Sequence, residues 1–215
     1  MGSSVLRVAV WAGCLSVGAA SATNLSFTGT FLQDDQLEVF LFTAPTNSFT
    51  AETWSYAGGT NANLQPIPAG GFAPVLSLFD DTGVLVATVE ANGTTADPVT
   101  GFMWDSVMTV GTLNSGESYT LVLSEFDNLP GATYSAGFSQ SGQGNFTPAE
   151  FGCGGTAPFC DPGVDQRNGT WAVDIDGVGT ASDVTPGVAP EPGSMLPLSA
   201  GLATLALLRR RRKRD

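Results

Sequence analysis

Six aspartates that precede or interrupt turn-forming stretches of the chain could bind calcium. They are Asp34, Asp35, Asp80, Asp81, Asp105 and Asp127. Calcium prefers the hard oxygens of carboxylates, amides and backbone carbonyls, and loops between strands can bring several of these groups together. No stretch follows the EF-hand spacing. The sequence therefore leaves two roles open for these six residues: solubility and Asx turns, or calcium ligation.

The inventory of reactive groups excludes most enzyme mechanisms. The chain contains no histidine, and its single lysine lies in the C-terminal segment 209–215. Ser-His-Asp and Cys-His arrangements, histidine-ligated metals and Schiff-base lysines are therefore excluded. A pair of carboxylates could still act as a glycosidase, but no pair stands out among the acidic residues. The sequence predicts a non-enzymatic protein and leaves a carboxylate-based glycosidase as an alternative.

Aromatic residues suggest a carbohydrate-binding face. Sugar rings can stack on exposed indole and phenol rings, and Trp104 and Tyr56 are the candidate stacking residues. We expect Trp54 and Trp171 to pack in the core instead. With the predicted calcium ligands, these rings define the leading alternative function, a calcium-dependent carbohydrate-binding module.

The segments that must position these residues have strand character. They alternate polar and apolar residues, are rich in β-branched and aromatic side chains, and show no sustained helical period. They cover 25–31, 36–43, 48–56, 75–79, 84–90, 106–111, 118–125, 133–138 and 169–176. Turn signals such as Asn92-Gly93 separate them, and 57–73 and 139–168 are predicted long loops. The pattern predicts an all-β, antiparallel β-sandwich of about nine strands.

Both ends of the chain indicate export. Arg7 precedes an apolar run over 8–20, and Ala20-Ser21-Ala22 is a signal-peptidase pattern, so we predict a signal helix within 1–22. Cys14 leaves lipoprotein acylation open as an alternative. Near the other end, an apolar stretch at 194–208 precedes six basic residues at 209–214. Its fifteen residues would span about 23 Å as a helix, less than the roughly 30 Å hydrocarbon core, which favours a single short, temporary transmembrane anchor.

These signals divide the chain into segments and set its charge. The predicted sandwich covers 23–181, a linker covers 182–193, and the basic tail at 209–215 stays in the cytoplasm. Residues 23–189 hold eighteen of the twenty acidic residues and one basic residue, Arg167, for a net charge of −17. Nucleic-acid binding is excluded because it requires many lysines and arginines. Cys153 and Cys160 form an even pair outside the cytoplasm and are predicted to be disulfide-bonded.

The C-terminal order of motifs resembles a known sorting signal. Pro190, Glu191 and Pro192, then a short apolar segment and a basic cluster, resemble the PEP-CTERM signal that exosortases process. The resemblance implies that these three residues are the recognition motif, with an exosortase as processing partner. It also implies Sec export to the cell envelope, cell surface or extracellular matrix, with extracellular polysaccharide as a possible partner. An ordinary membrane tail, whose prolines end a linker, remains the alternative.

The central segments resemble a second family. The stretches DDQLEVFLF at 34–42, PVLSLFD at 74–80 and GESYTL at 116–121 resemble the bacterial pre-peptidase C-terminal domain. TWSYAGGTN at 53–61, GQGNFT at 142–147 and PFCD at 158–161 further resemble a group of PEP-CTERM proteins built on that domain. The resemblance covers about 25–178 and implies a jelly-roll-like sandwich. It implies little about chemistry.

Overall fold

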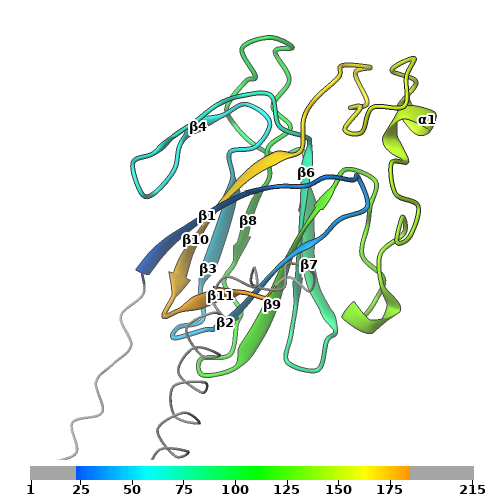
Figure 1. Ribbon diagram of the computed structural model, residues 1–215. Helices are drawn as coiled ribbons and strands as arrows, with labels where there is room; N and C mark the ends of the chain where they lie inside the picture. Colours follow the sequence, from blue (N-terminus) through cyan, green and yellow to red (C-terminus); the bar gives the residue numbers. More distant parts are fainter. Residues whose placement is uncertain (1–22, 185–215) are drawn as a thin grey trace, which may run out of the picture.

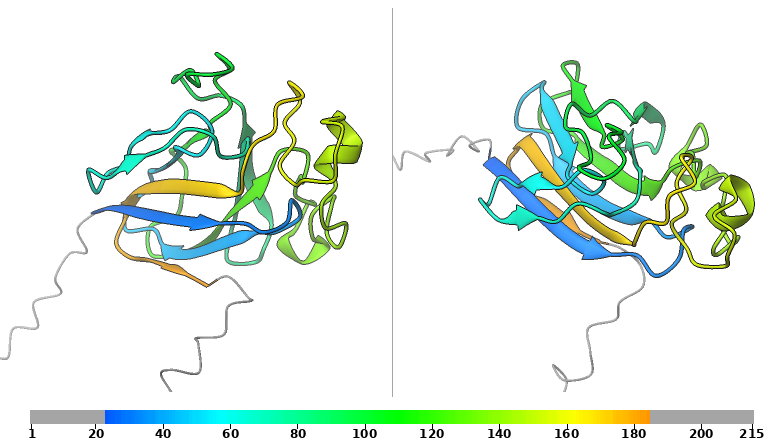
Figure 2. Two further views of the ribbon diagram at one scale, coloured as in Figure 1. Left: turned by 45° about the horizontal axis from the view of Figure 1, so that its top comes forward. Right: turned by 90° about the horizontal axis from the view of Figure 1, so that it is seen from above.

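Short strands pair into two antiparallel sheets in the computed structural model, which describes residues 23–184. Sheet A has the order β1 (Thr23–Thr30), β10 (Thr170–Val178), β3 (Phe49–Thr53) and β8 (Val107–Val110). Sheet B has the order β11 (Ala181–Asp183), β2 (Glu38–Thr43), β9 (Ser118–Glu125), β6 (Pro74–Phe79) and β7 (Leu85–Glu90). Figures 1 and 2 show the two sheets as layers. The predicted all-β, antiparallel class is confirmed for this part of the chain.

Alternating side chains from both sheets meet in one core. Trp171, Val173 and Ile175 point inward from β10, and the intervening Asp174 and Asp176 point outward, as the period of two requires. They pack with inward residues of sheet B such as Phe40, Leu76 and Leu121. Stacking of Phe42 on Phe49, with ring centroids 4.8 Å apart, joins the two layers directly. This shared core holds the strand ends, and therefore the loops, in fixed positions.

A smaller apolar cluster covers the outer face of sheet B. It consists of Val39, Phe79, Val122 and Phe138. Phe138 comes from the segment after β9, which folds back over the sheet and contains a short 3₁₀-helix, η1 (Tyr134–Ala136). Strand β6 is consequently buried on both faces along its whole length.

Three elements differ from the sequence expectation. The segment 133–138 is not a strand, because Tyr134 and Ala136 bond locally and form η1, with only single bridges at Thr133 and Phe138. The predicted loop 57–73 contains a hairpin made of β4 (Gly59–Thr60) and β5 (Pro66–Ile67). Strand β11 pairs with the edge of β2, so the sandwich extends to residue 183, two residues beyond the predicted boundary with the linker.

The long loop 139–168 contains the predicted disulfide and the α-helix of the described part, α1 (Thr147–Phe151). Pro148 lies in the first turn of α1, and Gly152 ends the helix with a φ of 83°, a left-handed conformation that favours glycine. Cys153 and Cys160 are bonded, with their Cα atoms 5.8 Å apart. The predicted disulfide is therefore confirmed, and it closes a short subloop after α1.

The predicted signal helix, anchor and sorting motif lie outside residues 23–184. Among the helices within that range, none combines the length and apolar character needed to cross a bilayer.

Candidate functional site

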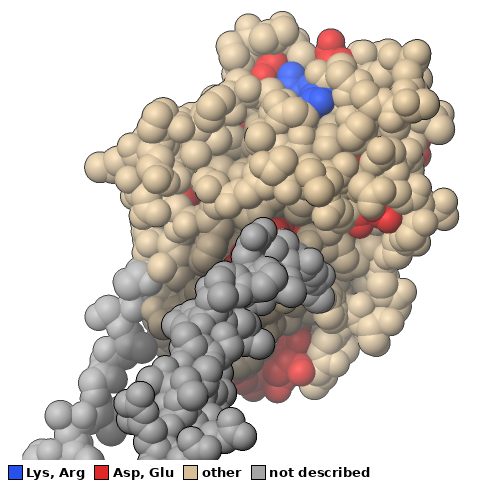
Figure 3. Space-filling view, viewed as in Figure 1, with Lys and Arg blue, Asp and Glu red and all other residues tan. Residues whose placement is uncertain are grey.

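The long loops meet at one end of the sandwich, where β1, β3 and β9 end and β6, β8 and β10 begin. We call this the loop end; it comprises residues 31–37, 54–73, 91–106, 126–129 and 139–169. Figure 1 shows it at the top. In Figure 3 blue basic atoms lie there beside red acidic atoms. Arg167 is the one basic residue within 23–184. Four of the six predicted calcium ligands belong to the loop end or border it.

Asp34 and Asp35 attach the long loop 139–168 to the sandwich. The buried Asp34 accepts hydrogen bonds from the Thr147 N–H at 2.8 Å, the Thr147 hydroxyl at 2.6 Å and the Phe159 N–H at 2.7 Å. Asp35 accepts from the N–H groups of Gly142 and Gly144 at 3.0 and 2.9 Å. Both carboxylates therefore act as acceptors for backbone donors that would otherwise lack partners.

Asp105 plays the same part for the chain that follows β3. Its carboxylate accepts from the Thr53 hydroxyl at 2.8 Å and from the N–H groups of Ser55, Tyr56 and Ala57 at 2.7, 3.1 and 2.8 Å. Burial raises the pKa of Asp105, although these hydrogen bonds oppose that shift. With its acceptor sites turned to the backbone, Asp105 fixes the direction in which the chain leaves sheet A.

A buried polar network surrounds Tyr56. Its hydroxyl donates to Asp161 at 2.7 Å, and the guanidinium carbon of Arg167 lies 3.9 Å from its ring centroid. Arg167 also pairs with Asp97 at 3.0 Å. Burial opposes ionisation of Asp97, but hydrogen bonds from Arg167 and Thr100 outweigh it and lower the pKa to about 2. Tyr56 has an exposed fraction of 0%, so its prediction as a sugar-stacking residue is wrong.

Trp104 is half-buried in a short aromatic ridge. Its indole stacks on Phe102 with ring centroids 4.2 Å apart, so one of its faces is covered. Phe102 and the neighbouring Met103 are exposed, at 40% and 49%. The core prediction holds for the buried Trp171, whereas Trp54 is half-buried and donates its indole N–H to Asp174 at 2.8 Å.

Of the three other predicted calcium ligands, two lie away from the loop end and one, Asp127, lies within it. Asp80 and Asp81 occupy the β6–β7 turn, at the strand ends opposite the loop end. Asp80 accepts from the Thr82 hydroxyl at 2.7 Å and the Val84 N–H at 2.9 Å, and these hydrogen bonds lower its pKa. Asp127 accepts from the Gln140 side chain at 3.2 Å. Across residues 23–184 no group of three or more His, Cys, Asp or Glu side chains could hold a metal ion, so the six residues do not form one site.

Glu125 is a buried acid that the sequence analysis did not select. It is fully buried at the end of β9, and neither carboxyl oxygen has a hydrogen-bond partner. Burial and the nearby carboxylates of Asp34 and Asp161 raise its pKa well above the ordinary value. The sequence did contain a signal for its burial. Alternation along β9 places Glu125 on the same inward face as Leu121 and Leu123.

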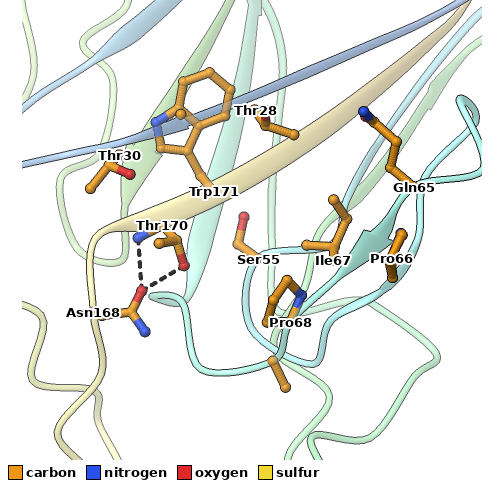
Figure 4. Close-up of a pocket in the computed structure, with 12 residues that line it drawn as sticks. Thr28, Thr30, Ser55, Gln65, Pro66, Ile67, Pro68, Asn168, Thr170 and Trp171 are labelled. Carbon is orange, nitrogen blue, oxygen red and sulfur yellow. Dashed lines mark hydrogen bonds between the residues drawn. The ribbon is translucent and has the colours of Figure 1, made fainter.

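A groove of about 480 Å³ opens on the outer face of sheet A (Figure 4). This volume is in the range of small-molecule sites. One side consists of β1 and the start of β10, and the other consists of the β4–β5 hairpin and the residues that follow it. Six of its lining residues carry a hydroxyl or a carboxamide: Thr28, Thr30, Ser55, Gln65, Asn168 and Thr170. None of the lining residues carries an ionisable side chain.

No protein-family model matches the chain, and a search of curated proteins finds no significant match.

Proposed function

We propose that the chain is a non-enzymatic, exported surface or matrix protein whose sandwich associates with extracellular polysaccharide. The observation that carries this proposal is the groove on sheet A, which is lined by hydroxyl and carboxamide groups without an ionisable side chain. Such a lining can bind a polar ligand, but it offers no acid, base or nucleophile of shifted pKa for a reaction. We further propose that the sandwich is jelly-roll-like and is related to the pre-peptidase C-terminal domain.

The hydrogen bonds and burial of the acidic residues argue against the glycosidase alternative. A glycosidase needs two carboxyl groups that flank an accessible sugar. Asp34 and Asp105 are turned to backbone donors, and Glu125 is sealed from solvent with an exposed fraction of 0%. The carboxyl groups of Asp34 and Asp105 therefore stabilise the loop end, and none of the three faces a substrate.

The proposed route to the surface depends on the termini. The signal peptide directs Sec export, the short anchor retains the chain briefly, and an exosortase recognises Pro190, Glu191 and Pro192. This places residues 23–189 outside the cytoplasm. A large negative charge in that part is compatible with a solvated extracellular matrix.

Fractionation of the native host with and without its exosortase tests this function. With the exosortase, the protein should be found with the extracellular polysaccharide and should lack residues 194–215 by mass spectrometry. Replacing Pro190, Glu191 and Pro192 by alanine should leave an uncut, membrane-retained form. Recovery of the native protein with residues 209–214 still attached would refute the sorting proposal and leave a simple tail anchor.

A further inference from the structure

We propose that the groove between β1, β10 and the β4–β5 hairpin binds a neutral saccharide unit, without calcium. This inference rests on the proposed function, because it names the ligand class and the residues of the same groove. Four properties of the groove support it: oriented amide donors, a row of hydroxyls, an apolar wall and the absence of charge.

Two carboxamides present NH₂ groups whose orientation is fixed. The Asn168 oxygen accepts from the backbone N–H of Thr170 at 2.9 Å and from the hydroxyl of the same residue, as Figure 4 shows. The Gln65 oxygen accepts from the side chain of the buried Asn61 at 3.1 Å. No residue of the described part accepts a hydrogen bond from either NH₂ group. Both amides therefore offer donors to a ligand without having to reorient.

A row of hydroxyls lies on the outer face of sheet A. Thr28 and Thr30 alternate along β1, and Thr30 pairs with Thr170 of β10 in the register of the sheet. All three are exposed. Ser55 lies nearby, and its oxygen accepts from the Ala172 N–H at 3.3 Å. The hydroxyls of Thr28 and Thr30 can both donate and accept, and the Thr170 hydroxyl, which donates to Asn168, can accept. The row therefore matches the hydroxyls of a sugar, which both donate and accept.

The opposite wall is apolar and rigid. Pro66, Ile67 and Pro68 line it, and Figure 4 shows them facing the threonine side. The C–H face of a sugar ring can pack on such a surface while its hydroxyls reach the polar side. Proline side chains lose little conformational freedom on binding, so this contact has a small entropic cost.

The hairpin is anchored to the sandwich before any ligand binds. The Ala62 N–H donates to Asp174 at 2.8 Å, and the Gly71 N–H donates to the Ser55 carbonyl at 2.9 Å. Gly58 has a φ of 68°, and a Cβ there would lie 2.5 Å from the backbone nitrogen of Ala69. The close approach of the two chain segments requires glycine at this position. A preformed groove of this kind does not have to be ordered by the ligand.

The electrostatics select a neutral ligand. No lining residue is ionisable, so the groove has no cation to pair with a carboxylate or sulfate on a sugar. Residues 23–189 also carry a net charge of −17, which repels anionic polysaccharides at low ionic strength. Because no lining residue carries a carboxylate, binding in the groove has no need of a bridging calcium ion.

The test measures binding of the full-length protein, in a detergent without sugar groups, to soluble neutral glycans. Dextran, mannan and cellohexaose serve as neutral probes and alginate as the anionic probe, each with calcium and with EDTA. Asn168→Asp and Gln65→Glu keep the oxygen that the fold uses, replace the NH₂ donor by an acceptor oxygen and add one negative charge. Each should weaken binding of a neutral probe at least tenfold. Thr30→Val, which removes one exposed hydroxyl and keeps the shape of the side chain, should weaken it about fivefold.

Gln143→Glu is the matched control, because it makes the same change of charge at an exposed side chain of the long loop. It should leave binding unchanged, and all variants should keep the melting temperature of the parent. Neutral-glycan binding that is equal in all variants would refute the groove as the site but leave the proposed function standing. Binding to alginate alone, loss of binding in EDTA, or no neutral binding by a protein that fractionates with the matrix would also overturn the inference. A protein absent from the matrix fraction would instead refute the proposed function.

Discussion

Replacement of Glu125 by glutamine should stabilise the exported protein at neutral pH. The side chain is fully buried, neither oxygen has a partner, and its charged neighbours are the carboxylates of Asp34 and Asp161. Such surroundings disfavour the ionised form and raise the pKa of Glu125 well above its ordinary value of 4.5. Glutamine keeps the shape of the side chain and removes the titration.

The sign of the pH dependence follows from the raised pKa. In the unfolded chain Glu125 loses its proton near pH 4.5, whereas the folded protein retains it to a higher pH. The folded state therefore binds more protons above pH 4.5, and its stability decreases as the pH rises towards the folded pKa. One proton gives a slope of at most about 1.4 kcal/mol per pH unit, or about 2.7 kcal/mol between pH 5 and pH 7.

Urea denaturation of the parent and of Glu125→Gln at several pH values measures this slope. Because other carboxyl groups titrate in the same range, the informative quantity is the difference in unfolding free energy between the two proteins at each pH. We expect the difference to grow by up to about 2.7 kcal/mol from pH 5 to pH 7. Glu90→Gln removes the same charge from an exposed position at the end of β7 and gives the baseline. Parallel curves for the parent and Glu125→Gln would show that burial does not keep Glu125 neutral.

Four further results are expected. Glu52→Lys should raise stability by roughly 0.2–1 kcal/mol in thermal melts, because Glu52 faces an aspartate of β10 across sheet A. Asp97→Asn should lower the unfolding free energy in urea by about 3–5 kcal/mol at pH 7, since it leaves Arg167 without its buried partner. The loss should shrink as the pH falls towards the Asp97 pKa of about 2. Alkylation of the unreduced protein should label neither Cys153 nor Cys160, and removing their bond should cost about 2.5 kcal/mol in urea. Calcium should raise the melting temperature no more than sodium at equal ionic strength, and a larger rise would reveal an ordered site.

The sandwich could be predicted because its strands have local signals. The strand 118–125 was predicted with the bounds that the structure gives, since Tyr119, Leu121 and Leu123 alternate and turns flank both ends. The segment 133–138 looked similar but forms η1, because the N–H groups of Ala136 and Gly137 bond back to Thr133 and Tyr134 instead of to a neighbouring strand. Composition alone does not distinguish these two outcomes.

The roles of the acidic residues could not be predicted, because they depend on contacts between distant parts of the chain. Asp34 binds the backbone near residues 147 and 159, and Asp105 binds residues 55–57. The positions of these aspartates at turns correctly indicated that they bind polar groups. The positions did not indicate that the partners would be backbone N–H groups instead of a cation. The groove was missed for the same reason. It combines β1, β10 and a hairpin within a segment that was predicted to be a loop.

The pairing of β1 with β10 has a consequence for the order of folding. These strands contain the first and nearly the last described residues of the sandwich, and Ser26 bonds to Asp174 across 148 positions. On the proposed route the chain crosses the membrane unfolded and from its N-terminus, so β1 emerges long before its partner. Sheet A can close only after almost the whole domain has been translocated, and such a high contact order favours slow folding. Until β10 emerges, the unpaired edge of β1 could pair with another chain. A temporary membrane tether that keeps nascent molecules apart would prevent this.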